Sequence, residues 1–205
     1  MIATLKGRPC QDSHGIATLF VDDASSFCHL TLHHSTTAKE ALDAKHCFEK
    51  VASDFGVHPK HYHGDNGIFA SSIFKQVCMT ANQRLNFSAL MAKWQNGVVE
   101  CHIRTLTERA RTMLLNAMHI WPNIITQDLW TFALKLAVDV HNNTPGVSGL
   151  SPIDIFSGSF EKNRHLDFHP FGCPVFVLEA SLQNGHKIPK WKPCLKNGSL
   201  PWSLI

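Results

Sequence analysis

Apolar residues recur along the chain with two spacings, and each spacing predicts one type of element. Residues 16–22 and 27–33 are rich in apolar and β-branched side chains and flank a serine-rich turn, which predicts an antiparallel hairpin. Apolar residues three and four positions apart predict helices. The predicted helices cover residues 38–55, 71–80, 99–118 and 126–140, and a short one starts at Ser151 and Pro152. Further short strands are predicted over residues 57–62, 84–87 and 175–178.

The order of these elements predicts an α/β fold. A hairpin at the start, followed by helices and short strands, favours a mixed sheet with helices on its faces. We therefore expect one core domain over residues 1–158. Residues 159–205 contain one predicted strand and then several prolines and glycines without periodicity, which indicates a loosely ordered basic tail.

Composition and charge narrow the class of protein. The 205 residues are 44% apolar and 17% charged, so the chain can form a core, and disorder throughout is excluded. Basic residues outnumber acidic ones by seven to three over residues 55–127 and by six to three over 159–205. A surface for a polyanion and ordinary surface lysine both fit this pattern. No apolar run approaches the ~18 residues of a membrane span, and no secretory signal is evident, so we expect no membrane partner.

Cysteine and histidine are scattered along the chain. The seven cysteines form no C-x-x-C pair, which favours a reducing compartment with most thiols buried as small apolar groups. None of the fourteen histidines combines with cysteines at zinc-finger spacing. His58, His61 and His63 alternate along a short predicted strand, but no cysteine accompanies them, so we expect no zinc site there.

Two carboxylates stand where hard divalent cations bind. Asp65 follows a short predicted strand, and Glu100 lies in the first turn of the long predicted helix. The intervening segment can fold back and bring them together, and carboxylate oxygens suit Mg²⁺. Alternatively, Glu100 is simply stabilised by the dipole at the N-terminal end of its helix.

The long helix adds basic residues to one of its faces. Glu100, Arg104, Thr107 and Arg111 share a face opposite the apolar stripe. Arginine can bind a phosphate group with two N–H donors. A helix face with Glu100 followed by Arg104 and Arg111 therefore suits a site that binds a metal ion and a phosphate. The alternative is a Glu–Arg pair four residues apart on a solvated helix.

Several ordered motifs resemble the integrase core of copia-type LTR retrotransposons. An Asp-Asn-Gly element is followed by a Gln-Asn-Gly-Val-Val-Glu element and by matching helix and turn segments. The resemblance runs from about Thr18 to about Trp191. The matching segments are 64–67, 95–100, 104–106, 110–114, 142–145, 151–158 and 171–175, together with Trp130, Ala133 and Ala137.

This resemblance implies an RNase H-like fold and a nuclear role in DNA integration. Such integrases are polynucleotidyl transferases that perform 3′-end processing and strand transfer with two Mg²⁺ or Mn²⁺ ions held by two aspartates and a glutamate. By resemblance, Asp65 is the second acid and Glu100 the third. The partners implied are element DNA, target DNA and further copies of the chain. The residues expected near nucleic acid are Asn66, Gln95, Asn96, Gly97, Arg104 and Arg111.

The first acid of the family has no counterpart in this sequence. In the family it lies on the first strand, a little upstream of a turn like Lys6-Gly7, whereas Asp22 aligns with a later element on the next strand. We therefore expect the first strand and its aspartate to be missing. Cys101 and His102 also replace the usual basic pair after Glu100. These departures leave a second hypothesis open, a catalytically inactive remnant that binds nucleic acid or integrase subunits.

Overall fold

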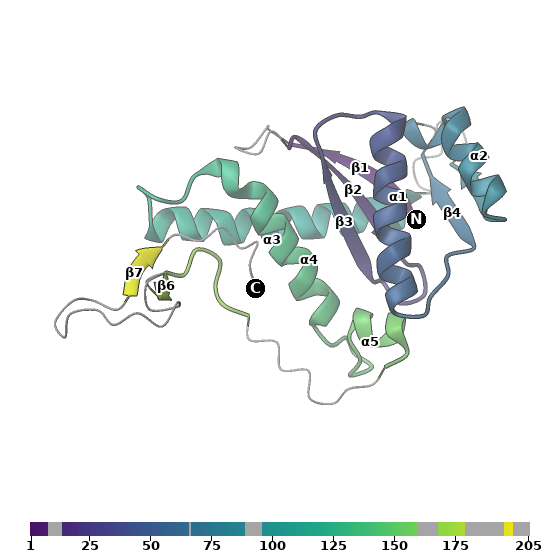
Figure 1. Cartoon of the computed structure of the whole chain (residues 1–205). Helices are drawn as coiled ribbons and strands as arrows, with labels where there is room; N and C mark the ends of the chain where they lie inside the picture. The colour runs from purple at the N-terminus through teal and green to yellow at the C-terminus, as the bar shows by residue number, and fades with distance from the viewer. Residues whose placement is uncertain (8–13, 66, 89–95, 160–167, 179–194, 199–205) are drawn as a thin grey trace.

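The computed structural model has a five-stranded mixed sheet with helices on both faces (Figure 1). It describes residues 1–7, 14–65, 67–88, 96–159, 168–178 and 195–198. The strand order is β3-β2-β1-β4-β5. Strand β2 pairs antiparallel with both β1 and β3, whereas β4 pairs parallel with β1 and with β5. The strands of this sheet are β1 Ile2–Lys6, β2 Ile16–Val21, β3 Cys28–His33, β4 His61–Gly64 and β5 Arg84–Phe87. This architecture confirms the predicted α/β class.

The first strand is where the structure corrects the sequence prediction. We expected the sheet to lack its first strand, but residues Ile2–Lys6 form β1 at the centre of the sheet. All five residues of β1 pair with residues of β2, and Ile2 also pairs with Gly64 of β4. The prediction failed because Ile2–Lys6 is short and precedes a turn, so its pattern alone does not identify a central strand. No residue of β1 carries a carboxylate.

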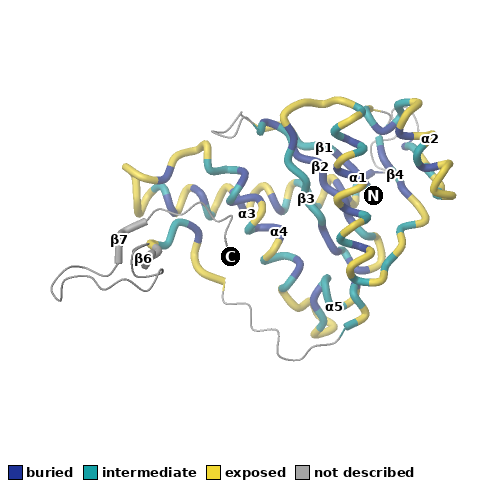
Figure 2. Tube along the Cα trace, in the orientation of Figure 1, coloured by how far each residue is buried: buried dark blue, intermediate teal, exposed yellow. Residues whose placement is uncertain are grey.

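Two apolar layers cover the two faces of the sheet. Alternate strand residues point to opposite faces, so Ala3, Leu19 and Val21 pack under α3 (Gly97–Ile120) and α4 (Trp130–Asn143). Ile2 and Phe20 point the other way, into a layer with α1 (Ala38–Asp54) and α2 (Ser72–Thr80). Figure 2 shows the buried residues concentrated where these helices meet the strands.

The remaining elements agree with the predicted order, with shifted ends. The hairpin β2–β3, the helices α1, α2 and α3, and strand β5 lie where the pattern placed them. Strand β4 begins four residues later than predicted, at His61. The short elements are η1 Ile68–Ala70, η3 Gln127–Leu129, α5 Pro152–Ser157 and the two-stranded pair of β6 Val175–Leu178 with β7 Leu195–Gly198. The rest of the predicted tail lies outside the described residues, and the division into two domains stays a prediction.

A buried ion pair anchors α1 to the strand that leads to Asp65. Lys45 is 1% exposed and contacts Glu49 at 2.7 Å. Glu49 also accepts hydrogen bonds from the Tyr62 hydroxyl on β4, at 2.9 Å, and from the Gln83 amide. Burial alone would raise the pKa of Glu49, but the hydrogen bonds from Lys45, Gln83 and Tyr62 together lower it below its ordinary value of 4.5.

Replacing Glu49 by glutamine is expected to destabilise the fold by about 2 kcal/mol at pH 7, because Lys45 is left buried without its partner. The lowered pKa means that ionised Glu49 stabilises the folded state above pH 4.5. This contribution is lost as the pH falls below 4.5 and through the folded-state pKa. Urea unfolding at several pH values should therefore show the wild type and the variant converging in acid. Glu108→Gln, at an exposed position of α3, is the control; equal pH dependence of Glu49→Gln and wild type would contradict the assignment.

No helix of the described part is both long enough and apolar enough to cross a membrane.

Candidate metal and nucleic-acid site

Asp65 directly follows β4, which ends at Gly64. Tyr62 and Gly64 contact the α1 side, where Phe69 lies beside Gly64. Because successive strand residues alternate between faces, a continuation of β4 predicts that Asp65 faces the α3 side. Its Oδ1 accepts a hydrogen bond from the Gly67 N–H at 3.2 Å. A Cβ at Gly67 would lie 3.1 Å from that oxygen, so any side chain there would crowd the carboxylate.

Glu100 lies in the first turn of α3, over the same face of the sheet. Its neighbour Val99 is fully buried in the core that also holds Ala3 of β1. Glu100 itself is exposed. That Asp65 and Glu100 act together as metal ligands stays a prediction.

The basic residues of α3 follow Glu100 along the exposed side of the helix. Arg104, Thr107 and Arg111 are all exposed. Lys45–Glu49 is the ion pair found among the described residues, so Glu100 and Arg104 do not pair across one turn. The Arg104 guanidinium lies instead 4.0 Å from the Cys101 sulfur. The alternative of a Glu–Arg pair on a solvated helix is therefore not what the structure contains.

The other predicted nucleic-acid neighbours lie at or just before the start of α3. Asn96 is 5% exposed, its side chain does not cap the helix, and its Oδ1 has no hydrogen-bond partner in the described part of the chain. Gly97 opens the helix with free space around its Cα. Asn66 and Gln95 lie outside the described residues.

No third carboxylate joins Asp65 and Glu100 among the described residues. Since Ile2 pairs with Gly64, the residue beside Asp65 on the α3 face of β1 is Ala3. The Asp22 carboxylate takes part in a local turn, where its Oδ2 accepts hydrogen bonds from the Ser25 N–H at 2.9 Å and the Ser25 hydroxyl at 2.7 Å.

These residues do not fit a two-metal site. Mg²⁺ is commonly held by one or two carboxylates and water, so Asp65 and Glu100 offer ligands for one hydrated ion. Two ions need carboxylates that bridge or flank them, and β1 contributes only apolar, threonine and lysine side chains.

The structure also assembles a cluster that the sequence did not predict. Cys28 at the start of β3, His102 on α3 and His141 on α4 place their ligand atoms within 4.8 Å of one another. The Cys28 sulfur lies 3.7 Å from His102 Nδ1, and the two imidazole rings are edge to face at 5.2 Å. Burial raises the pKa of the Cys28 thiol to about 12 and lowers the pKa of His102. The three residues are 74 and 39 positions apart in the sequence, so no local motif reveals the cluster.

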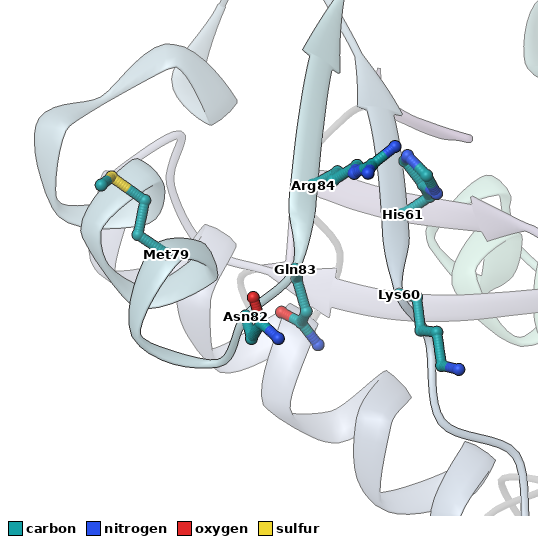
Figure 3. A pocket seen from close by; sticks show the side chains of 6 residues that line it. All are labelled: Lys60, His61, Met79, Asn82, Gln83 and Arg84. Atoms are coloured by element: carbon teal, nitrogen blue, oxygen red, sulfur yellow. The ribbon is translucent and has the colours of Figure 1, made fainter.

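A pocket lies where β4 and β5 begin, whereas Asp65 follows the other end of β4 (Figure 3). Its lining includes Lys60, His61 and Arg84, with His61 and Arg84 side by side on neighbouring strands. No carboxylate lines it, so it is not a site for a hard cation.

Comparison with solved structures places the fold among integrase cores. The HTLV-2 integrase catalytic core domain in complex with magnesium, in its trimeric form, matches with a TM-score of 0.54 and 20% identity, covering 76% of this chain and 92% of that one. The BIV integrase catalytic core domain matches with a TM-score of 0.54 and 21% identity, covering 77% and 92%. The chain therefore has the fold of a retroviral integrase catalytic core.

A larger assembly shows the same likeness. The simian T-cell lymphotropic virus intasome in complex with the PP2A regulatory subunit B56 gamma matches with a TM-score of 0.55 and 19% identity, covering 95% of this chain and 64% of that one. No family model matches the sequence, and no curated protein matches it either.

Proposed function

We propose that this chain is a copia-type integrase core that acts in DNA integration by binding DNA, and that it does not itself catalyse strand transfer. The observation that carries the proposal is the combination of an integrase-core fold with a central strand β1 that has Ala3, and no carboxylate, next to the residue that pairs with Gly64. The fold and the two acids support a role in DNA integration. The lack of a carboxylate on β1 supports a chain that does not catalyse strand transfer.

The exposed face of α3 is the surface we propose for DNA. Arg104 and Arg111 are exposed and form no ion pair among the described residues, so their guanidinium groups can bind phosphate oxygens. Asn96 and Gly97 lie at the N-terminal end of the same helix, where backbone N–H groups favour anions. Asn66 and Gln95 belong to the proposed surface by resemblance alone.

Divalent metal use and self-association belong to the same proposal. Asp65 and Glu100 would hold a single Mg²⁺ or Mn²⁺ ion, whose positive charge would favour DNA phosphate nearby. The HTLV-2 core is described in dimeric and trimeric forms, which supports association of this chain with further copies. A nuclear location follows only from the role in integration.

DNA binding is expected to weaken steeply with salt. If several arginines and lysines contact phosphates, affinity for a duplex should fall at least about tenfold between 50 and 200 mM salt, because bound counterions are released. The double variant Arg104→Glu/Arg111→Glu should reduce the slope of log affinity against log salt by about two. Fluorescence anisotropy of a labelled duplex measures both quantities.

Arg109→Glu is the matched control for this experiment. Arg109 is exposed on the same helix but lies off the face that carries Arg104 and Arg111. Its single charge change should leave the slope close to that of the wild type. If the chain does not bind the duplex, or if all variants show the same slope, the proposal that this face binds the phosphate backbone is contradicted.

A further inference from the structure

Three elements meet at a cluster of metal-binding side chains away from the proposed DNA face of α3. Cys28 comes from the edge strand β3, His102 from the second turn of α3 and His141 from the last turns of α4. Around the α3 axis, His102 lies on the opposite flank from Arg104 and Arg111. Cys28 is 1% exposed and both histidines are half-buried, so an ion can enter from the histidine side.

We propose that Cys28, His102 and His141 bind one Zn²⁺ ion, with water in the fourth position. Zinc prefers nitrogen and sulfur ligands in a tetrahedron. Zinc–sulfur and zinc–nitrogen bonds of about 2.3 and 2.1 Å separate the two ligand atoms by about 3.6 Å at a tetrahedral angle. The Cys28 sulfur and His102 Nδ1 lie 3.7 Å apart, and the ligand atom of His141 lies within 4.8 Å of both.

Hydrogen bonds to neighbouring residues hold two of the ligands in place. His141 Nε2 lies 3.0 Å from the Ser26 carbonyl oxygen and donates to it, which leaves Nδ1 with the lone pair that a metal needs. Asn142, the next residue, hydrogen-bonds both the N–H and the carbonyl of Cys28, at 2.9 and 2.7 Å. Metal-binding histidines commonly donate their second N–H to a carbonyl in this way.

The bound ion would fasten β3, α3 and α4 together at the start of the helix that carries Glu100. His102 is two residues beyond Glu100, so zinc would fix the orientation of that first turn. The proposal does not depend on DNA binding or on Mg²⁺. Without a metal, the same contact is a weak hydrogen bond between the Cys28 thiol and His102.

Cobalt titration of the reduced, metal-free chain tests the site. Co²⁺ replaces zinc and gives visible bands typical of tetrahedral coordination, with a near-ultraviolet band when a thiolate is bound. We expect one such ion per chain, displaced by Zn²⁺ but not by Mg²⁺. Cys28→Ser should remove the thiolate band, and His102→Gln and His141→Gln should each weaken binding at least about tenfold. Cys101→Ser and His119→Gln change exposed residues of the same helix and should leave the spectrum unchanged.

Thermal unfolding gives a second readout. Zinc at about a hundred times its dissociation constant should raise Tm by about 5–10 °C in the wild type and in Cys101→Ser, and by about half of that or less in the three ligand variants. If Cys28→Ser does not fold, the two histidine variants decide. Absence of tetrahedral Co²⁺, or a thiolate band that survives Cys28→Ser, would overturn the proposal.

Discussion

Replacing Asn142 by leucine is expected to lower the free energy of unfolding by about 3 kcal/mol. Asn142 is 6% exposed, and its side chain bonds both backbone groups of Cys28, the first residue of the edge strand β3. Leucine would leave two buried backbone polar groups without partners, each costing about 1–3 kcal/mol. It would also loosen α4 from the sheet, because this pair of bonds joins the two elements.

The adjacent asparagine is the control for this change. Asn143 donates only to the Asp139 carbonyl on its own helix, and its Oδ1 has no partner among the described residues. Asn143→Leu should therefore change stability by less than about 1 kcal/mol. Urea unfolding followed by circular dichroism measures both variants. A loss below about 1 kcal/mol for Asn142→Leu would mean that α4 docks without this bond pair.

Ala3→Asp is expected to destabilise the metal-free fold by about 3 kcal/mol and to make it respond to Mn²⁺. Ala3 is 6% exposed in the α3-side core, so an aspartate there is a buried charge without a partner. It would follow the β1 residue that pairs with Gly64, next to Asp65, and carboxylates near one another repel until a cation binds. Mn²⁺ at about a hundred times its dissociation constant should then restore about 2.7 kcal/mol.

Thr4→Asp is the matched control, because Thr4 points to the opposite face of β1. It should destabilise the fold without any added response to Mn²⁺. The wild type, with two carboxylates, should gain less than about 1 kcal/mol from the same ion. Urea unfolding with and without Mn²⁺ separates the three proteins. Equal responses in Ala3→Asp and Thr4→Asp would contradict the placement of β1 beside β4.

Local patterns were sufficient for most of the fold. The hairpin of β2 and β3 and the helices α1 and α3 follow from residue spacing, which short-range sterics and one-sided burial dictate. Strand β1 was missed because its place depends on pairing with β2 and β4, which no local signal encodes. Strand β7 was missed for the same reason, since its pairing with β6 is non-local.

The candidate site was predictable in part. Asp65 and Glu100 could be singled out because each stands next to a recognisable strand or helix end. Their roles as metal ligands stay predictions. The Cys28–His102–His141 cluster could not be foreseen, because tertiary packing alone brings β3, α3 and α4 together.

A strand-transfer assay tests the central claim most directly. A labelled duplex with a free 3′-hydroxyl is mixed with target plasmid, the chain and Mn²⁺, and both binding and joined product are measured. The account predicts a salt-sensitive complex and no joined product. Joined product that disappears in Glu100→Gln would contradict it by showing that the chain completes its acid set in another way.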